Sequence, residues 1–186
     1  LKYDNFFGTK LSYKQFKTYE NIIINFYDVG NFAVNKIANT DKINVLKNLS
    51  ISSKTKLISF YDDTWAFGGT QSFESYDKFL ESILKISNLN NTWTCIFRPK
   101  KNYDYYLRNS NDLILEKIDQ IIKSDRIIYL DSNFSAKDNI DAHNLIAVSD
   151  INIFSPMSSL SYDALCSKKK TIVFDPDKFY NNEKYV

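Results

Sequence analysis

The sequence predicts an α/β protein, with a parallel β-sheet covered by helices on both faces. From residue 56 onward, short apolar runs alternate with longer amphipathic runs. The short runs have apolar residues on both faces, as expected of strands buried on both sides, and each connection between parallel strands must cross one face of the sheet. The length of 186 residues and the 44% hydrophobic composition suit one well-packed domain. The expected architecture is therefore a Rossmann-like, doubly wound parallel sheet.

The order of these runs gives the individual elements. Strands are predicted at 56–63, 92–97, 126–130, 151–154 and 171–175, with helices between them at 72–87, 111–124, 138–149 and 160–168. Apolar residues spaced by three and four define the inward faces of the first two helices: Phe73, Tyr76, Phe79, Leu80, Ile83 and Leu84 in one, and Leu113, Ile114, Ile118, Ile121 and Ile122 in the other. The first 50 residues fit this pattern less well and predict only a strand at 22–27 and a short helix at 41–49.

Charge and cysteine usage narrow the functional classes. The formal net charge is +2, from 24 basic and 22 acidic residues that are scattered along the chain, which gives no support to nucleic-acid binding. Cys95 and Cys166 lie in apolar contexts at unrelated spacing, which indicates reduced thiols and a cytoplasmic protein. Neither a run of about 18 apolar residues nor a secretion signal is found in the sequence.

In an open parallel sheet, ligands bind outside the carboxyl ends of the strands. The loop after the first strand contains Gly68, Gly69 and Thr70, which would let a phosphate approach the backbone closely or would simply form a turn. The turn after the second strand contains Arg98 and Lys100, which can hold a diphosphate or lie on a solvated turn. The loop after the third strand is polar, and its backbone could frame a flat base.

The loop after the fourth strand is the strongest candidate. Ser155, Ser158 and Ser159 lie where a helix begins, and free backbone N–H groups with small side chains favour an anion there. Ordinary N-capping explains one serine, but three within five residues favour a phosphate site. Asp163, one turn further along, can accept hydrogen bonds from a ribose diol or complement the helix dipole.

Catalytic candidates are few. His143 is the only histidine and lies on a predicted helix, where a structural role is more common than chemistry. Asp62 and Asp63 are adjacent at the end of the first strand and would point to opposite faces, so only one of them, with Asp63 preferred, would face a cleft.

With these residues in view, the chain resembles the C-terminal, nucleotide-binding half of a GT-B glycosyltransferase, in particular the bacterial CDP-glycerol glycerophosphotransferase and capsule polysaccharide group. The similar features are a helix ending in Asp, a Ser-Ser pair, an aromatic-Asp pair and a strand ending in Asp-Pro; here they are Asp150, Ser158 with Ser159, Tyr162 with Asp163, and Asp175 with Pro176. The turn with Arg98 and Lys100 is similar to a Lys-Pro-His-Pro turn, and Val29, Gly30 and Asn31 are similar to a segment that joins the two domains of that group.

The resemblance implies a donor-binding domain at residues 51–186, preceded at 1–50 by a connection from an N-terminal domain that is missing here. In that fold Ser158 and Ser159 would hold the diphosphate of a nucleotide-activated donor, Arg98 and Lys100 would neutralise it, Asp163 would address the ribose, and no metal or other cofactor would be required. The acceptor, a glycan or a lipid-linked glycan, would bind the other domain, through which the enzyme could also associate with the inner face of the membrane. Because the chain begins at Leu1, we expect a fragment, whose activity by itself the sequence does not establish.

Two other readings stay open. A nucleotide-sugar epimerase of the same architecture would need catalytic carboxylates and histidines in both domains, and this chain has one histidine. A non-catalytic interaction module would use exposed aromatic residues for self-association and would bind no nucleotide. A dinucleotide-binding oxidoreductase is disfavoured, because no Gly-x-Gly-x-x-Gly follows the first strand.

Overall fold

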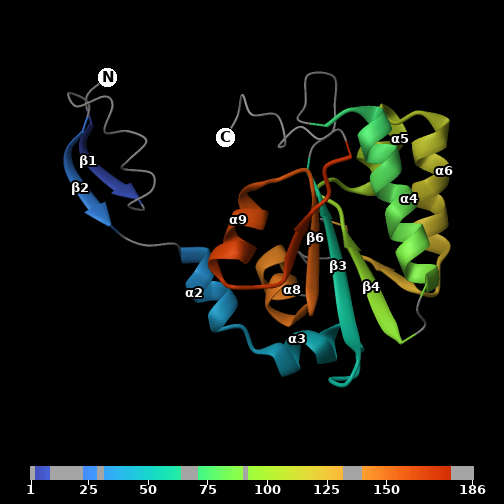
Figure 1. Ribbon diagram of the computed structural model, residues 1–186, viewed down its shortest axis with the longest axis horizontal. Helices are drawn as coiled ribbons and strands as arrows, with labels where there is room; N and C mark the ends of the chain where they lie inside the picture. The colour runs from blue at the N-terminus through green and yellow to red at the C-terminus, as the bar shows by residue number, and fades with distance from the viewer. Residues whose placement is uncertain are drawn as a thin grey trace.

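The computed structural model describes residues 3–8, 23–28, 32–63, 71–89, 92–131 and 140–176 of the chain. Its centre is a five-stranded, fully parallel sheet in the order β5-β4-β3-β6-β7. The strands are β3 (Lys56–Asp62), β4 (Trp93–Arg98), β5 (Ile127–Tyr129), β6 (Ile151–Ser155) and β7 (Thr171–Val173) (Figure 1). The predicted doubly wound α/β fold is confirmed, and all five predicted strands of this sheet are present.

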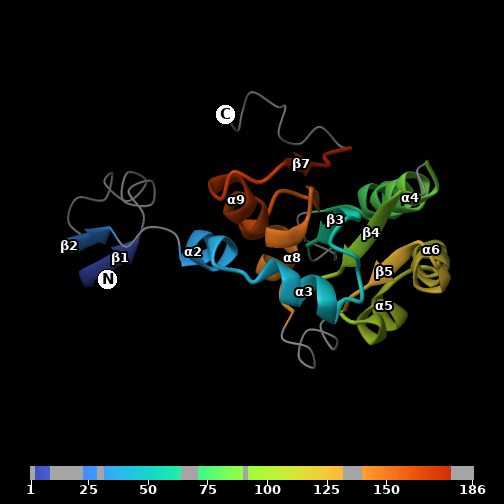
Figure 2. The same cartoon turned by 90° about the horizontal axis from the view of Figure 1, so that it is seen from below.

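Helices cover both faces of this sheet. One layer contains α4 (Phe73–Leu89), α5 (Tyr103–Asn109) and α6 (Asp112–Lys123). The other contains α2 (Phe32–Ala38), α3 (Lys42–Asn48), α8 (Ala142–Val148) and α9 (Ser159–Cys166). Figures 1 and 2 show the two layers on opposite sides of the strands.

Two hydrophobic clusters correspond to these layers. Because successive side chains of a strand point to opposite faces, Phe60 packs with Phe79 and Ile118 in the first layer, while Tyr61 packs with Ile146 and Phe154 in the second. All six of these side chains are 0 or 1% exposed. The sheet is therefore buried on both faces, which explains why its strands read as continuous apolar runs.

Some details differ from the sequence predictions. Phe73, Leu113 and Ile122 were predicted to face inward but are 40%, 52% and 40% exposed, because each lies at the margin of its helix's apolar face. The helices α2 and α5 were not predicted. Ile37 of α2 is buried in the same cluster as Tyr61, so part of the segment 1–50 packs against the domain that it precedes.

The described residues before α2 form a small separate sheet. β1 (Tyr3–Gly8) and β2 (Ile23–Asp28) pair in parallel, with Tyr3 opposite Ile23. The second was predicted, within one residue at each end, and the first was not. Within the described ranges, none of the helices combines the length and the apolar character needed to cross a membrane.

Candidate functional site

A cavity of about 200 Å³ lies at the carboxyl edge of the sheet. The chain runs from β3 outward to β4 and β5 on one side and returns to β6 and β7 on the other, so the topological switch point lies between β3 and β6. Crevices at such points are the usual ligand sites of open parallel sheets. The lining residues come from the ends of β3 and β4 and from the starts of α8 and α9: Tyr61, Asp62, Asp63, Arg98, Pro99, Lys100, Ala142, Ser158, Ser159 and Leu160.

Lys100 joins the ends of two neighbouring strands in this cavity. Its backbone N–H donates to Oδ1 of Asp62, and its ammonium group forms an ion pair with Asp63. Asp62 therefore binds the backbone of Lys100, and Asp63 binds its side chain. Both carboxylates line the cavity, so the prediction that only one of them would face a cleft is wrong. The Lys100 side chain is 53% exposed, so its ammonium group is also open to a ligand.

Arg98 is more deeply placed than Lys100. Its Nη1 donates to the backbone carbonyls of Pro99 at 3.0 Å and Leu130 at 2.9 Å, which fixes the guanidinium at the end of β4. Its Nε is buried and has no hydrogen-bond partner within the described ranges. Burial lowers the pKa of Arg98, while Asp131 and Asp62 oppose this shift. The guanidinium thus provides a fixed positive charge at the cavity wall.

The N-terminus of α9 forms another wall of the cavity, across from the basic turn that contains Arg98 and Lys100. Ser158 is the N-cap, and its backbone N–H and carbonyl are both hydrogen-bonded by the hydroxyl of Ser161, at 3.0 and 2.7 Å. The first N–H groups of a helix have no intrahelical acceptor and carry partial positive charge. Ser158 and Ser159 both line the cavity, so three of the predicted loops contribute to one site: those after β3, β4 and β6.

Other predicted residues lie elsewhere. Ser155 is fully buried, and its hydroxyl accepts from Nε2 of Gln71 at 2.7 Å instead of lining the cavity. Gly68, Gly69 and Thr70 lie outside the described residues, but Gln71, which directly follows them, is attached by this bond to the end of β6. The joining segment Val29, Gly30 and Asn31 is also outside the described residues.

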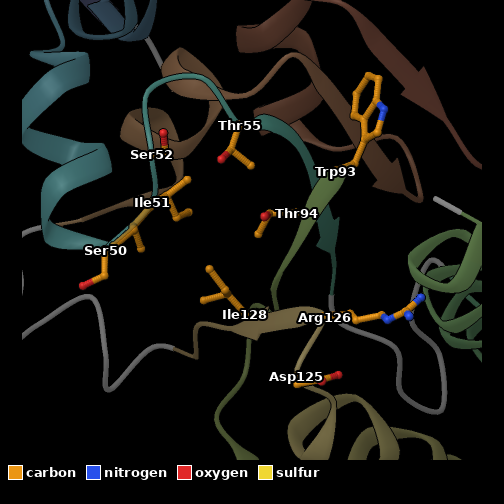
Figure 3. Close-up of a pocket in the computed structure, with 10 residues that line it drawn as sticks. Ser50, Ile51, Ser52, Thr55, Trp93, Thr94, Asp125, Arg126 and Ile128 are labelled. Carbon is orange, nitrogen blue, oxygen red and sulfur yellow. The ribbon is translucent and has the colours of Figure 1, made fainter. Parts of the chain in front are cut away.

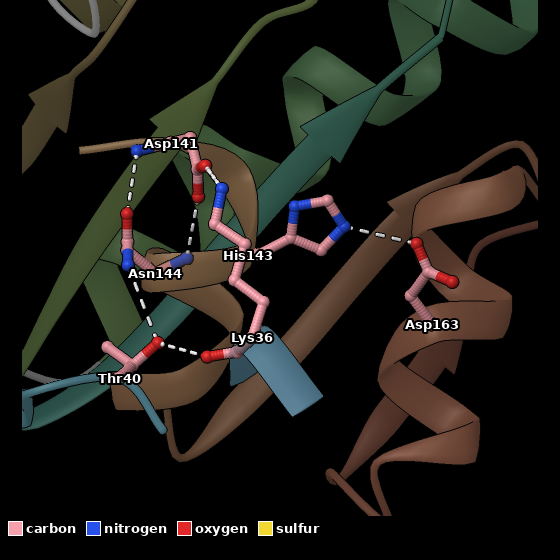
Figure 4. A network of polar contacts seen from close by, with 6 residues as sticks. All are labelled: Lys36, Thr40, Asp141, His143, Asn144 and Asp163. Carbon is pink, nitrogen blue, oxygen red and sulfur yellow. Dashed lines mark hydrogen bonds and ion pairs between the residues drawn. The ribbon is translucent and has the colours of Figure 1, made fainter. Parts of the chain in front are cut away.

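His143 and Asp163 form a pair between α8 and α9. Nε2 of His143 lies 3.1 Å from Oδ2 of Asp163, and the two side chains are 24% and 19% exposed (Figure 4). Neither side chain lines the cavity, although Ala142, next to His143, does. Sequence reasoning treated the two as separate candidates; the structure brings them together.

The same end of α8 is also tied to α2. The N-cap of α8 is Asp141, which accepts from the backbone N–H of Asn144 and forms an ion pair with Lys36. Asn144 donates in turn to the hydroxyl of Thr40, which follows α2 (Figure 4). These contacts hold α2 against the start of the helix that borders the cavity.

A buried cluster behind the cavity was missed by sequence reasoning. Asp62 is 6% exposed, and its Oδ2 accepts hydrogen bonds from the hydroxyls of Tyr76 and Tyr106, each at 2.7 Å. Burial raises the pKa of this carboxyl to about 6, against the lowering effect of its hydrogen bonds with Tyr106, Lys100 and Tyr76. The available signal was an acidic residue as the last member of an otherwise apolar strand.

A second, larger cavity lies at the opposite edge of the sheet. It measures about 350 Å³ and is bordered by the loop before β3 and the starts of β4 and β5. Figure 3 shows Trp93 and Arg126 pointing away from the space between Ser52, Thr94 and Ile128. It contains none of the predicted site residues and lies at the amino edge, so the cavity at the carboxyl edge is the better candidate.

Solved structures provide one comparison. The chain matches α,α-trehalose 6-phosphate synthase from Burkholderia multivorans with 14% identity and a TM-score of 0.40, over 89% of this chain and 42% of that one. It matches UDP-forming α,α-trehalose-phosphate synthase from Burkholderia xenovorans with 13% identity and a TM-score of 0.40, over 89% and 44%. The chain thus spans less than half the length of these two proteins. No curated protein matches the sequence.

A protein-family comparison provides the identification. The model of a family described as "Polysaccharide biosynthesis PFTS motif protein" matches residues 62–186. This range is 125 of the 186 residues, and it begins at Asp62 and includes every element from α4 to β7. The chain therefore belongs to the polysaccharide biosynthesis PFTS motif protein family.

Proposed function

We propose that the five-stranded domain binds the nucleotide diphosphate of an activated donor, as part of a glycosyltransferase or polyol-phosphate transferase of the GT-B type that makes a cell-surface polysaccharide. The observation that carries this proposal is the convergence of Lys100, Arg98 and the N-terminus of α9 on one cavity at the switch point of the sheet. Membership of a polysaccharide biosynthesis family supports the same class of reaction.

The family's name also bears on the site. In the one-letter code, PFTS is Pro-Phe-Thr-Ser, and the chain has three prolines, at positions 99, 156 and 176. Only Pro156 is followed, two and three positions later, by two hydroxyl residues, in the sequence Pro156-Met157-Ser158-Ser159. This tetrapeptide keeps the apolar second position and both hydroxyls. We assign it as this chain's form of the motif, which locates the family signature at the start of α9.

The chemistry expected at this site is stabilisation of a departing diphosphate. The N–H groups at the start of α9 would donate to the phosphate oxygens, and the small Ser158 and Ser159 side chains would allow close approach. Lys100 would place its ammonium on the same oxygens while Asp63 holds it in position, and Arg98 would add a fixed charge. Groups held in place before the reaction are effective at stabilising charge that develops in the transition state.

The His143–Asp163 pair fits the ribose end of such a donor. Asp163 lies on α9 about one turn beyond Ser159, and one of its oxygens already contacts His143. We propose that Asp163 accepts from a ribose hydroxyl and that His143 orients it. Asp63 is engaged by Lys100, so in this proposal it positions a cation instead of serving as the catalytic base.

Thermal denaturation of the chain with UDP, CDP or GDP tests the proposal directly. A ligand at about 100 times its Kd stabilises the native state by about 2.7 kcal/mol, which raises Tm by about 5–10 °C for a protein of this size. We expect such a shift with at least one of the three. No shift with any of them would refute a donor site in this domain.

Two variants test whether the diphosphate binds in the cavity at the carboxyl edge of the sheet. Lys100→Ala removes a charged donor from the cavity and is expected to weaken diphosphate binding about 10- to 100-fold. Its matched control is Lys101→Ala, since the Lys101 ammonium lies 5.2 Å from the centre of the Tyr105 ring and Lys101 does not line the cavity. Ser159→Trp would fill the space beside α9 and abolish the thermal shift. Equal affinities for the two lysine variants would place the ligand elsewhere.

A further inference from the structure

Three oxygen atoms from three different elements meet behind the cavity. They are Oδ2 of Asp62 at the end of β3, the hydroxyl of Tyr76 on α4 and the hydroxyl of Tyr106 on α5. Asp62 is 2.7 Å from each hydroxyl, and the two hydroxyls are 3.1 Å apart, so all three distances are short enough for a hydrogen bond. The tyrosine rings are stacked with centroids 6.2 Å apart, and both side chains are fully buried. The triangle is thus fixed by the core packing.

The number of protons in this triangle depends on Asp62. Burial raises the pKa of both tyrosines well above their ordinary value, so each keeps its one proton. Three hydrogen bonds among three oxygens require three protons, and the hydroxyls supply two. If Asp62 is ionised, both hydroxyls donate to it and none is left for the contact between them. If Asp62 is protonated, every contact has a proton and no side chain has to move.

The surroundings of Asp62 make its charge sensitive to an anion. Lys100 donates its backbone N–H to Oδ1 and can do so whether Oδ2 is protonated or not. Asp63, the residue that follows β3, disfavours a second negative charge, and Arg98 at the end of β4 favours one. Tyr129 of β5 interacts electrostatically with Asp62, and Asp131, two residues further on, interacts with Arg98. A diphosphate in the cavity would add negative charge directly against Asp62, which lines it.

We propose that Asp62 takes up a proton when a nucleoside diphosphate binds in the cavity, so that the site gains one unit of positive charge as the anion enters. This inference rests on the proposed function. With Asp62 ionised, the four charged side chains that line the cavity, Asp62, Asp63, Arg98 and Lys100, sum to zero; with it neutral, they sum to one positive charge. Because burial raises the Asp62 pKa to about 6, the free protein holds this carboxyl mostly ionised at neutral pH. Diphosphate affinity should then fall, as pH rises above 6, by up to about tenfold per pH unit.

Isothermal titration calorimetry measures the proton directly. The chain is titrated with UDP, CDP and GDP at pH 7, each in two buffers of different ionisation enthalpy, and the difference in heat gives the protons taken up per ligand bound. Because the terminal phosphate of the ligand also titrates, the quantity of interest is the uptake of the wild type minus that of Asp62→Asn. The amide of this variant would keep an acceptor for Lys100 and can donate to both hydroxyls. We expect a difference approaching one proton.

The control and the outcomes separate the two proposals. Asp104→Asn changes an exposed carboxylate of α5 outside the cavity and should leave the proton uptake of the wild type intact. Binding with equal uptake in the wild type and Asp62→Asn overturns this inference and leaves the proposed function standing. Absence of binding by the wild type overturns both. Should Asp62→Asn not fold, ¹³C-carboxyl NMR of the wild type gives the same answer: one aspartate must titrate near pH 6, and the same diphosphate must move its midpoint upward. A midpoint that stays unchanged refutes the inference.

Discussion

Replacing Asp62 with asparagine is expected to stabilise the domain at alkaline pH more than at acidic pH. Folding raises the pKa of this carboxyl from 3.8 to about 6, because burial disfavours its charged form. The native state therefore binds the proton more tightly than the unfolded chain does. Between about pH 4 and pH 6 the unfolded chain loses its proton first, so the free energy of unfolding falls as pH rises.

The size of this effect follows from the shift. Two pKa units correspond to about 3 kcal/mol, which is the full cost of holding Asp62 ionised in the native state at pH 8. At pH 4 the carboxyl is protonated in the native state and only partly ionised in the unfolded chain, so most of this cost is absent. The asparagine side chain would carry no charge at either pH. The difference in unfolding free energy between Asp62→Asn and the wild type should therefore grow by about 2–3 kcal/mol in favour of the variant between pH 4 and pH 8.

Urea denaturation of both proteins, followed by far-ultraviolet circular dichroism at several pH values, measures this difference. Because the prediction concerns how the difference in unfolding free energy changes with pH, any pH-independent difference in stability between asparagine and a protonated aspartate cancels. The control is Asp104→Asn, which neutralises an exposed carboxylate of α5 that does not line the cavity and should give no gain at pH 8. A difference that is constant with pH, or that favours the wild type increasingly at pH 8, would refute the assignment of Asp62 as a buried carboxyl whose charge destabilises the fold.

Three further results are expected. Ile118→Ala should lower the unfolding free energy by about 2–5 kcal/mol and Leu113→Ala on the same helix by less than about 1 kcal/mol, since Ile118 is fully buried and Leu113 is 52% exposed. Paired urea denaturation curves test this difference, and equal losses would contradict the core assignment. Asp163→Asn should weaken binding of a nucleoside diphosphate about tenfold or more but leave binding of inorganic pyrophosphate unchanged in calorimetry, because only the nucleotide carries a ribose; equal losses would remove Asp163 from the ribose site. Lys36→Ala should cost less than about 1 kcal/mol in the same denaturation assay, because its ion pair with Asp141 is 51% and 39% exposed, and a larger loss would mean that α2 depends on this pair.

The regular part of the fold was predictable because its signals are local. The helical face of α4 follows from the spacing of Tyr76, Phe79, Leu80 and Ile83, all of which are fully buried. Asn111, the first residue of the helix predicted at 111–124, is the N-cap of α6, and its side chain accepts from the backbone N–H of Ile114. Short helices such as α5 were missed, because seven residues with several tyrosines carry too little periodicity to be separated from a loop.

The site was predictable only in its local parts. Arg98, Lys100, Ser158 and Ser159 stand out because each follows a predicted strand, and parallel strands bring their carboxyl ends to one edge. Asp62 with its two tyrosine donors, by contrast, joins residues 14 and 44 positions apart, and no spacing rule relates them. Likewise, nothing in the local pattern indicates that His143 and Asp163, on different helices, would share a hydrogen bond.

The strand pair at the centre of the sheet has a consequence for synthesis of the protein. Asp150 accepts from the backbone N–H of Leu57 at 2.8 Å, and its own N–H donates to the Leu57 carbonyl, which fixes the register of β3 and β6 across 93 residues of sequence. β3 and β4 leave the ribosome first and can pair with each other, whereas β6 pairs with β3 only later, when this long loop closes. A nascent chain that has not yet released α9 has the basic turn with Lys100 but not the helix N-terminus that faces it. In the proposed function, anion binding thus begins only after α9 has left the ribosome, which makes it a marker of a completed domain.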